Sequence, residues 1–336
     1  MKQILNILNC PGTLAAGYDT YSATALRRMF NNKKVSHILD FSNDNRNRTL
    51  IDENIGRISI SGMQEKLSAI ADKGKICLTP PGAQSRYIIK PAPYEKRINN
   101  RKQLPANEHL TMQIARQVYG ILTAENALVF FQNGEIAYIT KRFDIKDDGT
   151  KCKQEDFASL AQKTNETDGK HFKYTGSYAE MGILFQKYTA AWKVEISKFF
   201  RLILFNYVFS NGDAHLKNFS LQQTENGDYM LCPAYDLLNT SLHINDGNFA
   251  LENGLFDKEF QSEIYRQKGD PCQEDFVLFG KMIDVPENQI KKTIELFLTP
   301  QPLVYNLIER SFLSEKMKRI YWRSYEERVQ RLKRQI

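Results

Sequence analysis

The sequence predicts a two-lobed α+β protein, because the chain is long and its pattern changes half-way along. The first half is rich in short strand-like runs, and the second half reads mainly as helices. A chain of 336 residues can bury a sizeable core in two lobes. We therefore expect a β-rich N-terminal lobe over residues 1–144, an all-helical C-terminal lobe over residues 145–336, and a cleft between them.

Short apolar runs bounded by Gly, Asp and Pro predict the strands of the first half. These runs are Arg57–Ser61, Leu67–Ala71, Lys75–Leu78 and Tyr87–Lys90. Asn133-Gly134 lies between two further runs, Ala127–Phe131 and Glu135–Thr140, and predicts a hairpin. Apolar residues at helical spacing predict a helix over Ala106–Gly120.

The same helical spacing predicts the long helices of the second half. They cover Ser177–Thr189, Lys193–Phe209, Asp284–Leu298 and Val304–Arg334. A second hairpin is predicted for Phe219–Gln222 and Tyr229–Cys232, which flank Asn226-Gly227-Asp228.

Composition excludes several classes of protein. Hydrophobic residues make up 42% of the chain, and no apolar run is long enough to span a bilayer, so we expect no membrane partner. The N-terminus lacks a signal-peptide core, and five scattered cysteines argue against a zinc site or disulfides, which favours a cytoplasmic location. The net charge of +7 is dense only from Lys316 to Arg334, which we interpret as a solvated helical face.

The stretch Asn211-Gly-Asp-Ala-His-Leu-Lys-Asn218 carries the strongest functional signal. Asp213 and Asn218 are five positions apart, which is the Asp-x4-Asn spacing of the catalytic loop of protein kinases. In that loop the Asp accepts the proton of the substrate hydroxyl, and the Asn oxygen binds Mg²⁺. The spacing therefore indicates Asp213 as a catalytic base and Asn218 as a metal ligand.

The second hairpin adds another candidate metal ligand. Asn218 and Asp236 are each nine positions from Gly227, so a hairpin folded there brings them side by side, within its register. Asn and Asp oxygens together suit Mg²⁺. Simpler interpretations stay open: the Asn-Gly-Asp run as an ordinary turn, Asp236 as a helix N-cap, and His215 as a buried structural histidine.

The first half holds residues suited to binding phosphate. The loop Ser59-Ile-Ser-Gly-Met-Gln-Glu-Lys66 lies between predicted strands, where N–H groups and a lysine can meet phosphate oxygens. Lys90 ends a strand, and Glu108 lies early in the next helix, like the lysine and glutamate of kinases. A hairpin with a surface lysine and an edge-strand lysine are the simpler alternatives.

Taken together, these motifs resemble the HipA-type kinases of toxin–antitoxin systems. The resemblance extends from about Gly56 to Leu298 and rests on these segments: Ser59–Lys66, Asn107-Glu108, Lys141-Arg-Phe-Asp144, Gln154-Glu-Asp-Phe157, Asn211–Asn218 and Ala234-Tyr-Asp-Leu-Leu238. It implies a two-lobed protein-kinase-like fold, ATP and Mg²⁺ as cofactors, and transfer of the γ-phosphate to a protein serine. Known targets in the family are aminoacyl-tRNA synthetases.

The resemblance also implies roles for individual residues. Asp213 would be the catalytic base, Asn218 and Asp236 would hold Mg²⁺, and Lys90 would contact phosphates. The other nucleotide-binding residues that it implies are Ser61, Gly62, Met63, Gln64, Glu65 and Lys66 of a phosphate loop, Lys141, Arg142 and Phe143 of a hinge that reads adenine through its backbone, and His215, Lys217 and Tyr235. Autophosphorylation at Ser59 or Ser61 would place negative charge beside that loop and inactivate the enzyme.

The chain departs from full-length HipA in two ways. The phosphate loop begins near Ser59, so the N-terminal subdomain of HipA is not expected here. This resembles the short HipT toxins of three-gene systems, which also carry a Ser-x-Ser pair, as Ser59 and Ser61 do. It implies a small HipS-like antitoxin and a HipB-like DNA-binding protein as partners, with DNA contacted only through the latter. Lys141 replaces an acidic residue, which a backbone-reading hinge tolerates.

Two other functions stay open as alternatives. One is a catalytically silent nucleotide-binding component of a transcription-repressing antitoxin complex, which the retained Asp213 and Lys90 argue against. The other is a small-molecule kinase of the aminoglycoside type, which the Ser59–Lys66 loop argues against.

Overall fold

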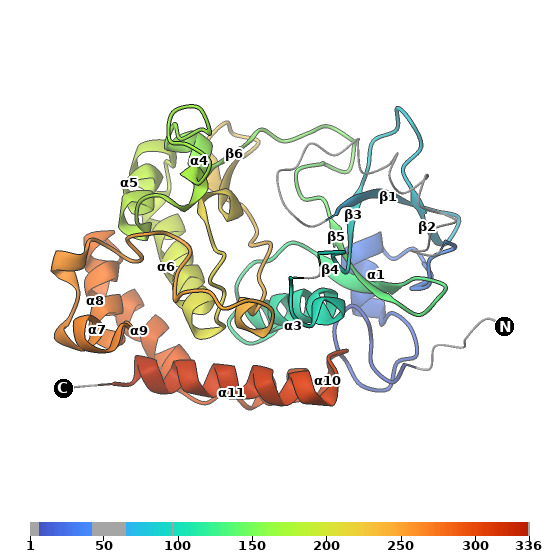
Figure 1. Cartoon of the computed structure of the whole chain (residues 1–336). Coiled ribbons are helices and arrows are strands. Elements are labelled where there is room, and N and C mark those ends of the chain that lie inside the picture. Colours follow the sequence, from blue (N-terminus) through green and yellow to red (C-terminus); the bar gives the residue numbers. More distant parts are fainter. Residues whose placement is uncertain (1–6, 42–64, 96, 335–336) are drawn as a thin grey trace. The chain divides into compact units, whose positions relative to one another are not determined.

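The computed structural model of the chain describes residues 7–41, 65–95 and 97–334 (Figure 1). The chain divides into two compact units. The first consists of Met1–Ile114, Ala124–Thr150 and Leu303–Lys318, and the second of Ala115–Thr123, Lys151–Pro302 and Arg319–Ile336. Each unit thus draws on three stretches of the chain, whereas the sequence suggested one division between residues 144 and 145.

The first unit is built on a five-stranded antiparallel sheet in the order β2-β1-β3-β5-β4 (Figure 1). The strands are β1 Leu67–Asp72, β2 Lys75–Leu78, β3 Tyr87–Pro91, β4 Asn126–Phe130 and β5 Ile136–Lys141. Lys73 and Gly74 form the β1–β2 turn with φ of +45° and +78°, a region that glycine adopts without strain. The strand predicted at Arg57–Ser61 lies outside the described residues.

Helices complete the first unit and close its core. They are α1 Ala23–Phe30, most of α3 Leu104–Gln117, and α10 Pro302–Arg310. The Ser22 hydroxyl caps α1 by accepting from the N–H of Ala25. The core lies between α1 and the sheet, and it includes Phe30 of α1, Leu67 of β1 and Ile89 of β3.

The second unit is helical apart from a small sheet. Its helices are α4 Phe157–Leu160, α5 Tyr178–Tyr188, α6 Trp192–Val208, α7 Glu263–Lys268, α8 Gln273–Met282, α9 Glu287–Leu298 and most of α11 Glu315–Leu332. The sheet has the order β6-β7-β8, and its strands are β6 Gln154–Asp156, β7 Ser220–Gln223 and β8 Tyr229–Leu231. The predicted β7–β8 hairpin is present, and its turn lies between Gln223 and Tyr229.

An aromatic core fixes the loop that follows α6. Phe199 on α6 packs against Phe185 of α5, with ring centroids 5.0 Å apart, and against Phe219, at 5.6 Å. Phe219 directly precedes β7. Because α6 ends at Val208, the core holds the chain on both sides of residues 210–218.

One predicted helix is two helices in the structure. The run Val304–Arg334 breaks at Ser311–Ser314, between α10 and α11. The Ser311 hydroxyl donates to the carbonyl of Ile308 at 2.6 Å, and the Ser314 N–H donates to Oε1 of Gln103 at 2.7 Å. Serine side chains that bond nearby backbone compete with the helix ladder, and the apolar spacing alone does not reveal that competition.

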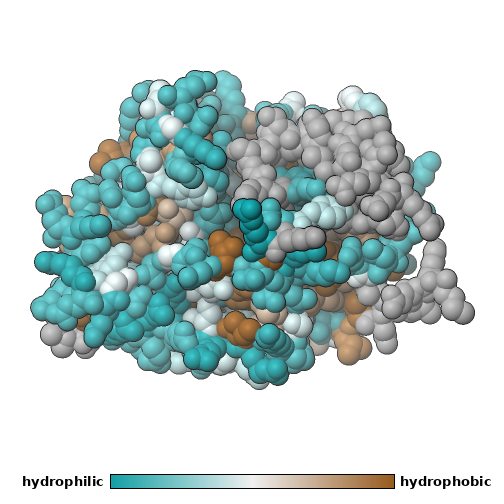
Figure 2. Space-filling model, viewed as in Figure 1, coloured by the Kyte–Doolittle hydropathy of each residue, from teal (hydrophilic) through white to brown (hydrophobic). Residues whose placement is uncertain are grey.

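The visible surface is mainly hydrophilic. On the face seen in Figure 2, hydrophilic residues cover most of the described surface, and the hydrophobic patches are small. Among the described helices, none combines the length and the apolar character needed to cross a bilayer. The five cysteines are free.

A buried histidine in α3 makes stability depend on pH. Burial lowers the pKa of His109 from 6.5 to about 3. Between these pH values the unfolded chain binds a proton at this residue and the folded chain does not. Stability is therefore complete above pH 6.5 and falls as the pH drops toward about 3. From pH 7 to pH 5 this residue alone is expected to remove about 2 kcal/mol. Urea unfolding at both pH values measures it.

His109→Gln tests this expectation, with His171→Gln, at an exposed position, as its control. His109→Gln should reduce the loss of unfolding free energy between pH 7 and pH 5 by about 2 kcal/mol. His171→Gln should leave that loss unchanged. Equal slopes for the wild type and His109→Gln would contradict the assignment.

Candidate active site

In the first unit, Lys90 and Glu108 form a buried ion pair. Lys90 lies in β3 and Glu108 in the first turns of α3, and Lys90 Nζ is 2.7 Å from Glu108 Oε1. Their side chains are 7% and 2% exposed. The ammonium also lies over the ring of Tyr138, 5.3 Å from its centroid. The predicted contact between a strand lysine and a helix glutamate is present.

The predicted hinge begins at Lys141, the last residue of β5, and its backbone is already hydrogen-bonded. The backbone N–H of Lys141 donates to Glu125, and that of Arg142 donates to Arg86, at 2.8 and 2.9 Å. Lys141 Nζ donates to Asn31 Oδ1 at 3.0 Å. The N–H groups of these two hinge residues are therefore engaged within the first unit.

The expected phosphate loop falls mostly outside the described residues. Ser59, Ser61, Gly62, Met63 and Gln64 are not described, whereas Glu65 and Lys66 lead into β1. Their role in binding nucleotide therefore stays a prediction.

In the second unit, residues 211–218 form a tightly held loop directly after α6. The Asn211 side chain donates to Oδ1 of Asn206 at 2.9 Å and approaches the carbonyl of Asp236 at 3.5 Å. The Gly212 N–H donates to Oγ1 of Thr240 at 2.9 Å. These contacts bind the Asn-Gly-Asp run to a segment about thirty residues later in the chain, which an ordinary surface turn does not do.

Position 212 has no space for a side chain, so only glycine fits there. A Cβ at this position would collide with the carboxylate of Asp246 and with the carbonyl of Gly247. Asp246 is half-buried, and burial raises its pKa, with the nearby charge of Asp213 adding to the effect. Asp246 and Thr240 thus both pack against Gly212 of the loop, and no sequence motif predicted a role for either residue.

The Asp213 carboxylate lies at the edge of this loop and accepts a hydrogen bond from the hydroxyl of Tyr174 at 2.9 Å. Next to it, His215 is buried, and burial lowers its pKa to about 4. The histidine is therefore neutral at pH 7, and its Nε2 can accept from Lys173 Nζ, which is 3.0 Å away.

Both predicted acidic residues contact the side chain of Asn211, whose Oδ1 accepts from the N–H of Asp213 at 3.4 Å and whose Nδ2 approaches the Asp236 carbonyl at 3.5 Å. The carboxylates of Asp213 and Asp236 both act to raise the pKa of His215, against the larger effect of burial. Asp236 has φ of +55°, a backbone conformation that is costly for a non-glycine residue. Such strain gathers at functional sites, where the surrounding structure enforces it.

The hairpin register differs slightly from the one expected. Leu221 pairs with Leu231 and Gln223 with Tyr229, so the hairpin is centred on residue 226. The register expected from the sequence was centred on Gly227, one residue later, and the ladder itself ends before it reaches Asn218 or Asp236. The left-handed turn at Asp236 lies beyond the end of the ladder.

Asn218 provides an oxygen suited to a metal ion. Its Oδ1 is buried and has no hydrogen-bond partner within the described part of the chain. An orphaned buried amide oxygen fits Mg²⁺, which accepts oxygen ligands and takes its remaining ligands from water or phosphate. Among the described residues, His, Cys, Asp and Glu form no cluster of three that could hold a metal. The amide oxygen of Asn218 and the carboxylate of Asp236 are ligand types that suit Mg²⁺.

Tyr235 and Lys217 tie the loop to the small sheet. The Tyr235 hydroxyl donates to the carbonyl of Lys217 at 2.9 Å and lies 2.6 Å from Ser220 Oγ. Lys217 Nζ is 3.4 Å from Asp156, the N-cap of α4. Both predicted residues therefore support the loop, through contacts that the sequence did not indicate.

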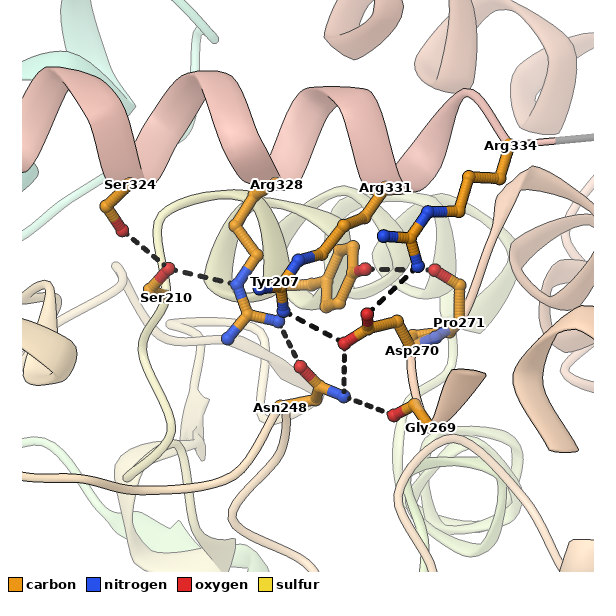
Figure 3. Close-up of polar contacts among 10 residues, drawn as sticks. All are labelled: Tyr207, Ser210, Asn248, Gly269, Asp270, Pro271, Ser324, Arg328, Arg331 and Arg334. Carbon is orange, nitrogen blue, oxygen red and sulfur yellow. Dashed lines mark hydrogen bonds and ion pairs between the residues drawn. The ribbon is translucent and has the colours of Figure 1, made fainter. Parts of the chain in front are cut away.

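The C-terminal helix α11 braces the start of the loop (Figure 3). Ser324 Oγ and Arg328 Nε contact the hydroxyl of Ser210 at 3.0 and 3.1 Å. The Arg328 guanidinium also stacks on Tyr207, 5.0 Å from the ring centroid, and donates to Asn248. Ser210 has φ of +52° and directly precedes the 211–218 loop, so these contacts hold a strained position.

The sequence suggested that the basic tail is a solvated helical face, but several of its arginines bind other parts of the second unit. Arg328 is 8% exposed, and Arg331 and Arg334 bind the carboxylate of Asp270 at 2.9 and 3.0 Å (Figure 3). Arg323, which pairs with its own helix, fits the original interpretation. Spacing along the sequence could not separate the two kinds of arginine.

Comparison with protein families matches residues 58–298 to the HipA-like C-terminal domain. The chain belongs to this HipA-like family. The match includes Lys90, Glu108 and the whole 211–218 loop. The resemblance stated from the motifs is thus confirmed at the level of the family, whereas the HipT subtype stays a prediction.

Curated relatives of this HipA-like chain are named as kinases. A Haemophilus influenzae protein named "Putative kinase" is 28% identical over 313 residues, which are 88% of this chain and 87% of that protein. A Sinorhizobium fredii protein of the same description, Y4dM, is 32% identical over 211 residues, 59% of this chain and 48% of its own length.

Solved structures confirm the kinase-like α+β fold. A HipA chain of Shewanella oneidensis, solved with HipB and operator DNA, has a TM-score of 0.59 and 20% identity. The match covers 82% of this HipA-like chain and spans 65% of the length of that HipA. The Helicobacter pylori proinflammatory kinase CtkA has a TM-score of 0.50 and 15% identity, covering 79% and 93% of the two chains.

Proposed function

We propose that this chain is a toxin Ser/Thr protein kinase that transfers the γ-phosphate of ATP to a protein serine. The observation that carries the proposal is the placement of Asp213 and Asp236 near His215, together with the buried, unpartnered Oδ1 of Asn218 on a loop with the Asp-x4-Asn spacing. The buried pair of Lys90 and Glu108 supplies the phosphate-binding lysine in the other unit. Kinases use these same parts for positioning and for charge stabilisation.

Each residue has a distinct part in this proposal. Asp213 accepts the proton of the attacking serine hydroxyl while the bond from that oxygen to phosphorus forms and the bond from phosphorus to the leaving oxygen of ADP breaks. Asn218 and Asp236 would hold Mg²⁺, which neutralises phosphate charge when bound. Lys90, oriented by Glu108, binds the α- and β-phosphates.

Substrate and partners belong to the finer part of the proposal. An aminoacyl-tRNA synthetase is the proposed substrate, because the motifs resemble kinases that act on such enzymes. A HipB-like protein is a proposed partner, since the similar HipA of Shewanella oneidensis was solved with HipB and operator DNA. A HipS-like partner is proposed only from the resemblance to the short HipT toxins. Phosphate on Ser59 or Ser61 would add roughly −1.5 to −2 charge beside the phosphate loop and oppose binding of ATP.

Phosphoproteomics of cells that produce the chain tests the function. The wild type should raise phosphoserine on a small set of proteins and on its own Ser59 or Ser61, and Asp213→Asn should not. Asp228→Asn, an exposed change at the tip of the β7–β8 hairpin, is the matched control and should behave as the wild type. Phosphate transfer to aminoglycosides with no protein target would favour the small-molecule kinase, and no nucleotide turnover at all would favour the silent component.

A further inference from the structure

A short turn outside the recognised motifs lies directly against the 211–218 loop. Phe172–Tyr174 forms one turn of 3-10 helix between α4 and α5. Its three successive side chains contact alternate residues of the loop. The ring centroid of Phe172 is 5.8 Å from Lys217 Nζ, and Lys173 Nζ is 3.0 Å from His215 Nε2. The Tyr174 hydroxyl is 2.9 Å from Asp213 Oδ1. The two segments are therefore matched residue by residue.

This turn is itself held in place. The Tyr174 carbonyl accepts from the N–H of Glu252 at 2.9 Å. Thr175, the next residue, receives two hydrogen bonds from Lys163 Nζ, at 3.2 Å to its carbonyl and 3.0 Å to its hydroxyl. Because both neighbouring segments fix the backbone, the Tyr174 ring is brought to Asp213 by the fold and not by chance rotation of a free side chain.

Protonation fixes the direction of the contact. Burial, and then the charge of Asp213, raise the pKa of Tyr174 above its usual value, so the hydroxyl keeps its proton at pH 7. A neutral hydroxyl beside a carboxylate donates, which orients the carboxylate and occupies Oδ1. The other oxygen, Oδ2, is then the one left for an incoming hydroxyl.

We propose that Tyr174 is a positioning residue for the catalytic base: its hydroxyl holds Oδ1 of Asp213, so that Oδ2 accepts the proton of the substrate hydroxyl. The proposal rests on the proposed kinase function. Tyr174 keeps its own proton throughout, and Asp213 alone takes up the proton of the acceptor. The alternative role is inhibition: a tyrosine hydroxyl bound to the base occupies the place of a substrate hydroxyl and would block substrate binding.

Steady-state kinetics of Tyr174→Phe decides between these roles. If Tyr174 positions Asp213, kcat falls about 10-fold and KM for ATP stays within about twofold, because the ring and its packing remain. Adding Tyr174→Phe to Asp213→Asn should cost nothing further, since the hydroxyl acts through that carboxylate. A kcat equal to or above that of the wild type, or additive losses in the double variant, would overturn the proposal. Tyr188→Phe, at another half-buried tyrosine of the same unit, is the control and should leave kcat unchanged.

A second measurement does not depend on activity. In protein labelled with ¹³C at Cζ of tyrosine, the Tyr174 resonance is the one missing from Tyr174→Phe. Replacing Asp213 by alanine should shift this resonance, because its hydrogen-bond acceptor is lost, and should leave that of Tyr188 in place. An unmoved Tyr174 resonance refutes the contact, whether or not the wild type uses ATP. A shifted resonance in a chain without kinase activity would instead count against the proposed function.

Discussion

Asp213→Asn is expected to lower the rate of phosphoryl transfer by about 10²- to 10⁴-fold, the usual contribution of a positioned general base. Asparagine has nearly the same shape, and its amide oxygen can still accept from the Tyr174 hydroxyl, which is 2.9 Å from the carboxylate in the wild type. It cannot take up the proton of the acceptor, however. The substitution therefore removes the chemistry while keeping the contacts of the 211–218 loop.

Transfer of radiolabelled phosphate from ATP to a protein substrate, or to the chain itself, measures this effect. Binding of a fluorescent ATP analogue should change little, since Asp213 acts on the acceptor and not on the nucleotide. Asp228→Asn should retain the activity of the wild type. If Asp213→Asn keeps half of that activity, Asp213 is not the base, and the kinase mechanism proposed here is wrong.

Glu108→Ala is expected to destabilise the fold by about 3–5 kcal/mol, because it removes the carboxylate that lies against the buried Lys90 ammonium. The side chains of Lys90 and Glu108 are 7% and 2% exposed, and their charged atoms lie 2.7 Å apart. Urea unfolding of the variant and the wild type gives the difference directly. Nucleotide affinity should fall as well, since the lysine loses the partner that orients it.

An exposed ion pair in the same unit is the matched comparison. Lys102 and Glu135 lie 3.4 Å apart, with side chains 73% and 38% exposed, so Glu135→Ala should change stability by at most about 1 kcal/mol. The double variant Lys90→Met with Glu108→Leu should recover much of the lost stability but not the binding of ATP. A loss for Glu108→Ala as small as that for Glu135→Ala would contradict a structural role for the pair.

Local patterns in the sequence determined most of the elements and the family. The Asn133-Gly134 turn predicted the β4–β5 hairpin, apolar spacing predicted α5 and α6, and the Asp-x4-Asn spacing marked the loop that begins at Asn211. These features are encoded within a few residues, since turn chemistry, helical period and loop spacing are properties of neighbours in the chain. Order along the chain likewise placed a lysine on β3 and a glutamate on α3.

The tertiary structure alone decided which distant side chains support the loop. Tyr174 reaches Asp213 across thirty-nine positions, and Arg328 reaches Ser210 across 118. Neither residue stands in a pattern that marks it, because a hydrogen bond between distant segments depends on how the intervening chain packs. The break at Ser311–Ser314 has the same origin, since its N–H partner Gln103 lies 211 positions away. Sequence periodicity indicates which face of a helix or strand is buried, whereas tertiary packing determines which residues that face contacts.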